Sequence, residues 1–138
     1  MEDNCIFCKI TKKQIGSYIL YEDDDFQVIF DNSPATKGHA ILITKKHFKN
    51  LFEMDEATAS KLFPVVLKVS KIMKEEFNCS GFNLVQNNGK DAGQTVFHFH
   101  LHLIPRYEKD GVDFRWSSSE FNKDEAASMA NIIFNKSK

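Results

Sequence analysis

Phe97-His98-Phe99-His100-Leu101-His102-Leu103-Ile104 decides the fold, because histidine and apolar residues alternate along it. Successive side chains of a strand point to opposite faces of a sheet, so the alternation predicts a half-buried strand. Its core face would carry Phe97, Phe99, Leu101 and Leu103. The three imidazoles would then form a row on the other face, whereas a helix would scatter them around its axis.

Short strands and two longer helices are predicted outward from this stretch. The further strands are expected at residues 18–21, 26–30, 39–44 and 82–86. Helical segments are expected over 5–11, over 55–77 and from about Asn122 onward, and Pro64 predicts a kink or a late start in the longest. This order favours an α+β fold, with a largely antiparallel five-stranded sheet, one long helix and a C-terminal helix.

Composition restricts the class of protein. A chain of 138 residues fits one domain, so we expect a single domain over residues 1–138. Eighteen basic and nineteen acidic residues leave a net charge of −1, which gives no global field for nucleic acid or an anionic membrane. No run approaches the roughly 20 apolar residues of a membrane helix. Three cysteines without an apolar signal segment favour a reducing compartment, and we expect the cytoplasm.

The alternating histidines admit a structural, a metal-binding and a nucleophilic interpretation. A structural role fits one strand histidine better than three in a row. Positions i and i+4 of a strand lie roughly 13 Å apart, so one zinc ion, with bonds of about 2 Å, binds at most two adjacent members. An imidazole with a pKa of about 6.5 is mostly neutral at pH 7 and can attack an electrophile, while a second one holds or donates a proton.

The loop before the strand offers hydrogen-bond donors. It supplies side-chain amides, a hydroxyl and unobstructed backbone N–H groups from Asn87, Asn88, Gly89, Gly93, Gln94 and Thr95. Preorganised donors of this kind suit the developing charge of a phosphoryl group. Without the histidines, the same loop would be interpreted as a hairpin connection.

The run from Gly93-Gln94-Thr95-Val96 through the three histidines to Pro105-Arg106 resembles the signature of the histidine-triad (HIT) superfamily of nucleotide hydrolases and transferases. Further blocks extend the resemblance over residues 5 to about 106: Cys5–Ile10, Tyr21–Asp24, Phe30-Asp31, Gly38-His39 and Lys45–His47. The layout is similar to the nucleoside phosphoramidase (Hint-type) branch. The resemblance implies the HIT fold, a homodimer, and hydrolysis at the α-phosphorus of a purine nucleotide conjugate.

The resemblance also implies a role for each histidine of the site. His100 would attack the α-phosphorus and form a nucleotidyl-histidine that water later hydrolyses. His102 would contact the phosphate or assist the leaving group, and His39 would support the triad from behind. Related uridylyltransferases carry glutamine where His102 stands, which favours hydrolysis over transfer.

The substrate-binding residues implied by the resemblance fall into three groups. The loop residues Asn87, Gly93, Gln94 and Thr95 would hold phosphate or ribose oxygens. Asp31 would bind the ribose hydroxyls as a bidentate acceptor. The base would enter an apolar slot formed by Ile6, Phe7, Ile10 and Ile29.

Cys5-x-x-Cys8 needs two more ligands to make a closed zinc site. A redox motif would be expected after a strand in a βαβ unit, and only four residues precede Cys5. His47 and His98 can supply the missing ligands, and zinc-bearing members of the family match all four positions. The resemblance therefore implies a structural zinc ion, which would withdraw His98 from catalysis.

Several functions stay open at this point. Adenosine 5′-phosphoramidate-like compounds are the expected substrates, and diadenosine polyphosphates are the alternative through the same intermediate. A nucleotide-binding sensor or interaction protein is a second class of function. A hydrolase with catalytic zinc on the triad is a third: chelation would then abolish activity and leave the fold intact, whereas loss of structural zinc would lower stability.

Overall fold

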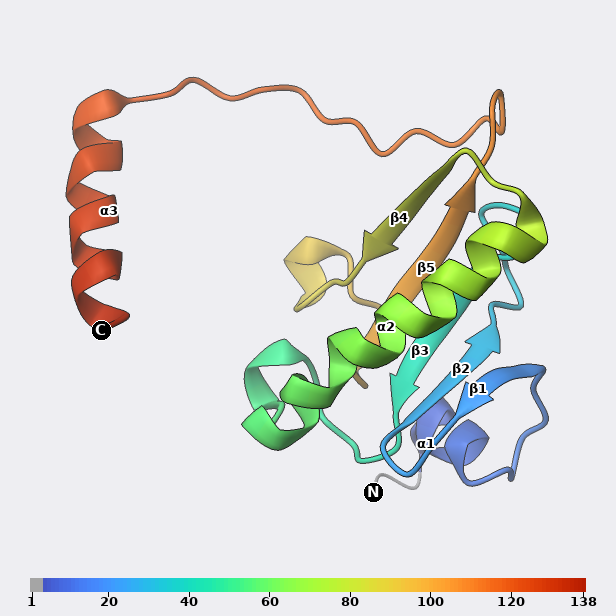
Figure 1. Ribbon diagram of the computed structural model, residues 1–138. Coiled ribbons are helices and arrows are strands. Elements are labelled where there is room, and N and C mark those ends of the chain that lie inside the picture. The colour runs from blue at the N-terminus through green and yellow to red at the C-terminus, as the bar shows by residue number, and fades with distance from the viewer. Residues whose placement is uncertain (1–3) are drawn as a thin grey trace.

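A five-stranded antiparallel sheet forms the centre of the molecule (Figure 1). The computed structural model describes residues 4–138. The strands are β1 (Ile19–Glu22), β2 (Phe26–Phe30), β3 (Ala40–Thr44), β4 (Gly81–Val85) and β5 (His100–Arg106). They lie in the order β1-β2-β3-β5-β4, and every neighbouring pair is antiparallel. The predicted α+β class and sheet are confirmed.

Three helices accompany the sheet, together with two short 3₁₀ turns. The helices are α1 (Ile6–Thr11), α2 (Glu56–Phe77) and α3 (Lys123–Lys136), and the turns are η1 (Leu51–Glu53) and η2 (Lys90–Ala92). The Asp55 carboxylate accepts the Thr58 N–H at 2.7 Å and caps the start of α2. Pro64 lies inside α2, so the predicted late start is wrong.

The two faces of the sheet are covered by different helices. Helix α2 packs on one face, over a core that includes Phe26, Val28, Leu42, Leu101 and Leu103. Helix α1 packs on the other face, where Phe7 and Ile10 contact Ile29, Ile41 and Ile43. In the register between β3 and β5, Ile41 pairs with His102 and Ile43 with His100. Paired residues share a face, so both imidazoles lie on the side of α1.

The histidine strand begins later than its alternation predicts. β5 starts at His100, because the chain bends at residues 96–98 and the Phe99 N–H donates to the Phe48 carbonyl at 2.7 Å. Phe97 is 43% exposed and does not enter the core. His98 is fully buried beside the start of α1. The predicted row of three imidazoles on one strand face is therefore wrong, and two of them share the strand.

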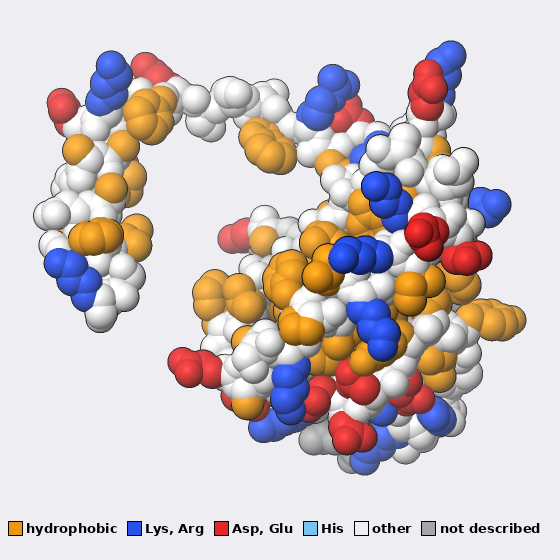
Figure 2. Space-filling model, viewed as in Figure 1, with side chains coloured by type: hydrophobic (Ala, Val, Ile, Leu, Met, Phe, Trp, Pro, Cys, Tyr) orange, Lys and Arg blue, Asp and Glu red, His pale blue; other side chains and the backbone are white. Residues whose placement is uncertain are grey.

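Residues 111–138, the C-terminal arm, leave the sheet. Residues 111–122 form neither helix nor strand, and α3 has no buried residue (Figure 1). The predicted helix start is confirmed, since the Asn122 side chain accepts the Glu125 N–H at 3.0 Å. Hydrophobic side chains show on the arm and on the visible surface of the sheet region (Figure 2). Across residues 4–138, each helix is too short or too polar to cross a bilayer.

Candidate functional site

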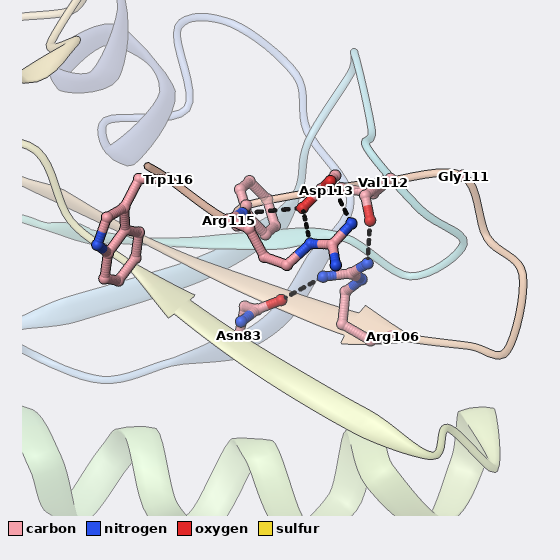
Figure 3. A pocket seen from close by; sticks show the side chains of 8 residues that line it. Asn83, Arg106, Gly111, Val112, Asp113, Arg115 and Trp116 are labelled. Carbon is pink, nitrogen blue, oxygen red and sulfur yellow. Dashed lines mark hydrogen bonds and ion pairs between the residues drawn. The ribbon is translucent and has the colours of Figure 1, made fainter. Parts of the chain in front are cut away.

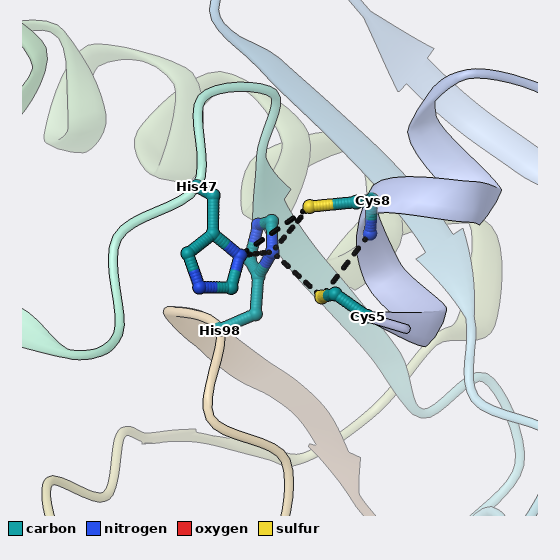
Figure 4. Close-up of side chains that lie close together, drawn as sticks. All are labelled: Cys5, Cys8, His47 and His98. Atoms are coloured by element: carbon teal, nitrogen blue, oxygen red, sulfur yellow. Dashed lines mark hydrogen bonds between the residues drawn. The ribbon is translucent and has the colours of Figure 1, made fainter. Parts of the chain in front are cut away.

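Two cysteines and two histidines converge at the start of α1 (Figure 4). His98 Nδ1 lies 3.2 Å from Cys5 Sγ, 3.5 Å from Cys8 Sγ and 3.1 Å from His47 Nδ1, and Cys8 Sγ lies 3.3 Å from His47 Nδ1. All four ligand atoms lie within 4.8 Å of one another. A tetrahedral zinc ion would hold nitrogen pairs about 3.4 Å apart and nitrogen–sulfur pairs about 3.6 Å apart. The four side chains can therefore hold a metal ion of this kind.

The hydrogen bond of His98 Nε2 leaves Nδ1, the nitrogen that faces the cluster, free of a proton and able to bind a metal ion. His98 Nε2 lies 2.7 Å from the Thr44 carbonyl oxygen, which can only accept, so Nε2 carries the proton and Nδ1 keeps its lone pair. Burial lowers the pKa of His98 to about 4 and favours the neutral ring. Cys5 also caps α1, because its Sγ accepts the Cys8 N–H at 3.4 Å.

A pocket of about 420 Å³ lies beside this cluster and contains His100 and His102. The structure brings eight of the nine predicted substrate-binding residues to its wall: Ile6, Phe7, Ile10, Ile29, Asp31, Asn87, Gly93 and Thr95. The apolar side chains come from α1 and β2, and the polar groups come from the ends of β2 and the loop before β5. The pocket wall also contains five residues that the sequence did not single out: Phe30, Asn32, Ser33, Ile41 and Val96. Phe30 and Val96 stand in the quoted family blocks, but no role was expected for their side chains.

His100 presents a nitrogen lone pair to the pocket. Its Nδ1 lies 2.7 Å from the His98 carbonyl oxygen, so Nδ1 carries the proton and Nε2 keeps the lone pair. Burial lowers the pKa of His100 below its ordinary value, and the ring stays neutral at pH 7. The Phe7 ring meets the imidazole edge-on at 4.9 Å between centroids. This geometry suits a nucleophile.

His102 has the opposite tautomer, which a chain of hydrogen bonds fixes. The Ala35 N–H donates to His39 Nδ1 at 2.8 Å, so neutral His39 carries its proton on Nε2. His39 Nε2–H donates to His102 Nδ1 at 2.9 Å. His102 Nδ1 is therefore the acceptor, and the neutral ring carries its own proton on Nε2. Burial lowers the pKa of His39, and burial and the neighbouring histidines lower that of His102 to about 4. His102 therefore presents a hydrogen-bond donor beside the lone pair of His100.

Asp31, His39 and His102 form a second cluster, with potential ligand atoms within 4.8 Å of one another. A metal ion on His39 Nε2 would require the proton on Nδ1, where the Ala35 N–H already donates. Asp31 Oδ2 instead lies 3.5 Å from His39 Nε2 and opposes the lowering of its pKa. This hydrogen-bond arrangement disfavours the catalytic-zinc alternative.

Gln94 does not line the pocket that contains His100 and His102. Its side chain is 4% exposed, and its amide is engaged with backbone groups. Oε1 accepts the Gly89 N–H at 2.8 Å, and Nε2 donates to the carbonyls of Lys49 and Val96 at 2.8 and 3.0 Å. We expected it to reach phosphate or ribose oxygens, and the structure places it as a support of the loop.

A larger pocket, of about 840 Å³, lies at the base of the C-terminal arm (Figure 3). Arg106 donates to Asn83 Oδ1 at 2.8 Å, to both oxygens of Asp110 at 2.8 and 3.0 Å, and to the Val112 carbonyl. Arg115 is paired with Asp113 at 3.0 Å. Both guanidinium groups are thus neutralised, and the pocket reflects how the arm is attached to the sheet.

The fold and the paired histidines define a histidine-triad domain. A family model described as HIT domain matches residues 12–109. The chain therefore belongs to the HIT family.

Relatives of known structure or name agree with this assignment. "Protein hit" of Bacillus subtilis is 43% identical over 117 residues, which cover 84% of this chain and 81% of that protein. Adenosine 5′-monophosphoramidase hnt1 of Schizosaccharomyces pombe is 35% identical over 136 residues, which cover 98% of this chain and 99% of that protein. A crystal structure of a HIT family protein from Bacillus anthracis has a TM-score of 0.92 and 45% identity, and all of both chains is covered.

Proposed function

We propose that the protein hydrolyses adenosine 5′-phosphoramidates and related purine nucleotide conjugates at the α-phosphorus, through a covalent nucleotidyl intermediate on His100. The main support is the pair of opposite tautomers on β5, whose ring centroids lie 5.2 Å apart. One ring offers a lone pair to phosphorus, and the other offers an N–H to a phosphoryl oxygen. The name of the S. pombe relative, a monophosphoramidase, supports the substrate class.

The pocket suggests how such a substrate binds. The apolar wall from α1 and β2 would take the purine ring, because the two faces of the ring are apolar and pack against such side chains. Asp31 Oδ1 accepts the Ser33 N–H at 2.8 Å, which holds the carboxylate in place for the ribose hydroxyls. Thr95, Asn87 and Gly93 would surround the phosphate together with His102.

The reaction would proceed in two displacements. His100 Nε2 bonds to phosphorus while the bond between phosphorus and the substrate's amine nitrogen breaks. That nitrogen takes a proton from solvent and departs as the free amine. Water then bonds to phosphorus, the P–N bond to His100 breaks, and the proton lost by water returns to solvent. The His98 carbonyl stabilises the imidazolium of the intermediate through Nδ1–H, and His102 Nε2–H stabilises negative charge on the phosphoryl oxygens.

We further propose that Cys5, Cys8, His47 and His98 bind a structural zinc ion. Two thiolates and two neutral imidazoles form a closed tetrahedral donor set, with no position left for substrate. When bound, the ion would cross-link three parts of the chain: the start of α1, the segment after β3 that carries His47, and the segment before β5 that carries His98. The His98 carbonyl would thereby be held at the place where it contacts His100.

A homodimer is the proposed assembly, with the C-terminal arm of one copy on its partner. α3 exposes apolar side chains, including Met129, Ile132 and Ile133, which are 48%, 51% and 66% exposed. α2 likewise exposes Phe63 and Leu67, which are 61% and 56% exposed. Exposed apolar side chains gathered on two helices favour association. Light scattering should give a dimer mass, and Ile132→Glu should lower it toward that of one chain; a monomeric wild-type protein would contradict the proposal.

The central test compares wild type with His100→Ala on an adenosine 5′-phosphoramidate. We expect kcat to fall at least about 10³-fold, because the nucleophile is removed. Rapid quench and mass spectrometry of the wild type should find an added nucleotidyl group on the peptide that contains His100. Tyr18→Ala, at a side chain 77% exposed, is the control and should keep wild-type turnover. Wild-type turnover by His100→Ala would contradict the mechanism, and nucleotide binding without turnover by the wild type would favour a sensor.

A further inference from the structure

A pocket of about 540 Å³ opens next to the proposed nucleotide pocket and shares Ile6, Thr95 and Val96 with it. The rest of its wall, which together with these three defines the Lys49 pocket, is Asn4, Cys5, His47, Lys49, Glu53 and Phe97. The proposed chemistry leaves this space unused. A phosphorus atom between His100 and Thr95 would lie at the boundary, so a leaving group directed past Thr95 would enter the Lys49 pocket.

The Lys49 pocket is a built feature, because two side chains tie its two walls together. The buried amide of Gln94 donates to the Lys49 carbonyl at 2.8 Å and to the Val96 carbonyl at 3.0 Å. Asn88 Oδ1 accepts the Leu51 N–H at 2.8 Å, a second link between the same two segments. Hydrogen bonds from these side chains to backbone groups thus hold both the Lys49 segment and the loop before β5 beside the reaction centre. Gln94 therefore has a structural role in this pocket.

Lys49 brings a positive charge to this wall. Its Nζ lies 5.7 Å from the centroid of the Phe97 ring. Across residues 4–138, no carboxylate oxygen lies within 4.0 Å of Lys49 Nζ. Glu53, the acidic residue of the pocket, accepts the backbone N–H of Lys49 through Oε1 at 2.8 Å. The ammonium group is therefore available to an incoming anion, and the ring beside it is 43% exposed.

We propose that the Lys49 pocket is a leaving-group subsite that favours leaving groups with a negative charge, carried by a carboxylate or a phosphate. Lys49 receives the anion, and Phe97 contacts the adjoining carbon atoms. The inference rests on the proposed hydrolase function and adds a substrate class to it. The leaving amine then carries a carboxylate or a phosphate group, so the enzyme distinguishes conjugates by the half that it releases.

Matched substrates test this subsite. Adenosine 5′-phosphoramidates of glycine and of glycinamide differ by a carboxylate against a carboxamide, and those of phosphoethanolamine and ethanolamine differ by a phosphate. For each pair, the measured quantity is the ratio of kcat/KM for the anionic substrate to that for the neutral one. Lys49→Gln should lower at least one ratio roughly tenfold, because a charge-assisted hydrogen bond is lost. Lys46→Gln removes an equal charge from a lysine that pairs with Asp55 and should keep the wild-type ratios.

The outcomes separate the two proposals. A fall confined to the glycine pair identifies a carboxylate as the preferred anion, and a fall confined to the phosphoethanolamine pair identifies a phosphate; either supports the subsite. Full turnover with both ratios unchanged in Lys49→Gln overturns the subsite and leaves the hydrolase function standing. If the wild type hydrolyses none of the four conjugates, the proposed function fails, and the subsite fails with it.

Discussion

Two histidine pairs of this protein have nearly the same nitrogen separation and opposite chemistry. His47 Nδ1 and His98 Nδ1 lie 3.1 Å apart, and His39 Nε2 and His102 Nδ1 lie 2.9 Å apart. In the first pair, His98 donates its outer proton to the Thr44 carbonyl and turns a lone pair inward. In the second, His39 accepts the Ala35 N–H at its outer nitrogen and turns a proton inward.

The outer partner therefore decides what each pair can hold. Where the outer nitrogen donates to a carbonyl, the inner nitrogen keeps a lone pair that can bind a cation. Where the outer nitrogen accepts an amide N–H, the inner nitrogen carries a proton that it can donate. The distance between the rings does not distinguish these cases. The two adjoining sites proposed here, one for a metal ion and one for a phosphoryl group, thus use the same residue type.

Removal of the metal should have the largest effect, and only on the first pair. Cys8→Ser should lose the bound metal and at least about 3 kcal/mol of the free energy of unfolding, because metal binding and folding are coupled. Metal analysis and urea unfolding measure both quantities. Cys79→Ser, at a buried cysteine outside the cluster, is the matched control and should keep its metal. A folded, metal-free and equally stable Cys8→Ser would remove the structural zinc proposal.

Loss of the second pair should affect turnover and leave the metal bound. His39→Ala removes the donor to His102 Nδ1, and we expect kcat/KM to fall about 100-fold because His102 loses its fixed tautomer. His39→Gln should recover part of this loss, since its amide can accept from Ala35 and donate to His102. Metal content is the second measurement. If His39→Ala lost its metal, the two pairs would not be independent.

The partly buried, neutral state of His102 should make stability depend on pH. Its folded-state pKa of about 4 lies below the ordinary value of 6.5, so the unfolded chain takes up the proton first as the pH falls. Stability present above pH 6.5 should decrease by about 2 kcal/mol toward pH 4. Urea unfolding at pH 6.5 and 4.5 should show a smaller decrease for His102→Gln. An equal decrease in both proteins would contradict a neutral His102.

The smallest expected effect is that of Thr44→Val, which tests whether the carbonyl or the hydroxyl of Thr44 orients His98. Its hydroxyl donates to the Lys46 carbonyl at 2.8 Å, whereas its carbonyl accepts from His98. Thr44→Val keeps the carbonyl and should cost about 1 kcal/mol of stability with unchanged metal content. Loss of metal in Thr44→Val would mean that the hydroxyl, and not the carbonyl, orients His98.

The sequence predicted the fold class and most of the pocket, because both rest on local patterns. Hydrophobic alternation located β2 without error and β1 and β4 within one residue. The family resemblance named eight residues that the structure places at the wall of the histidine pocket, and Gln94, the ninth, lies outside it. Each of these inferences depends on side-chain type and spacing, which the sequence displays directly.

The errors have long-range causes. Alternation continues through residues 97–99, but the hydrogen bond from Phe99 to Phe48 ends the strand pattern, and no local signal announces it. Gln94 looks like a substrate ligand, and the carbonyl of Lys49, 45 residues away, engages its amide instead. The tautomers of His98 and His39 likewise depend on backbone groups that composition and spacing do not identify.

Cys5 links two segments that are far apart in the chain, and this link sets an order of assembly during synthesis. It caps α1 and contacts His98, a residue 93 positions later in the chain. Chains emerge from the ribosome N-terminal end first, and a six-residue helix is marginal without tertiary contacts. Helix α1 is therefore made before the strand region around His98 and must wait until that region has been translated. Helix α1, which supplies Phe7 and Ile10 to the pocket, is begun early and completed late.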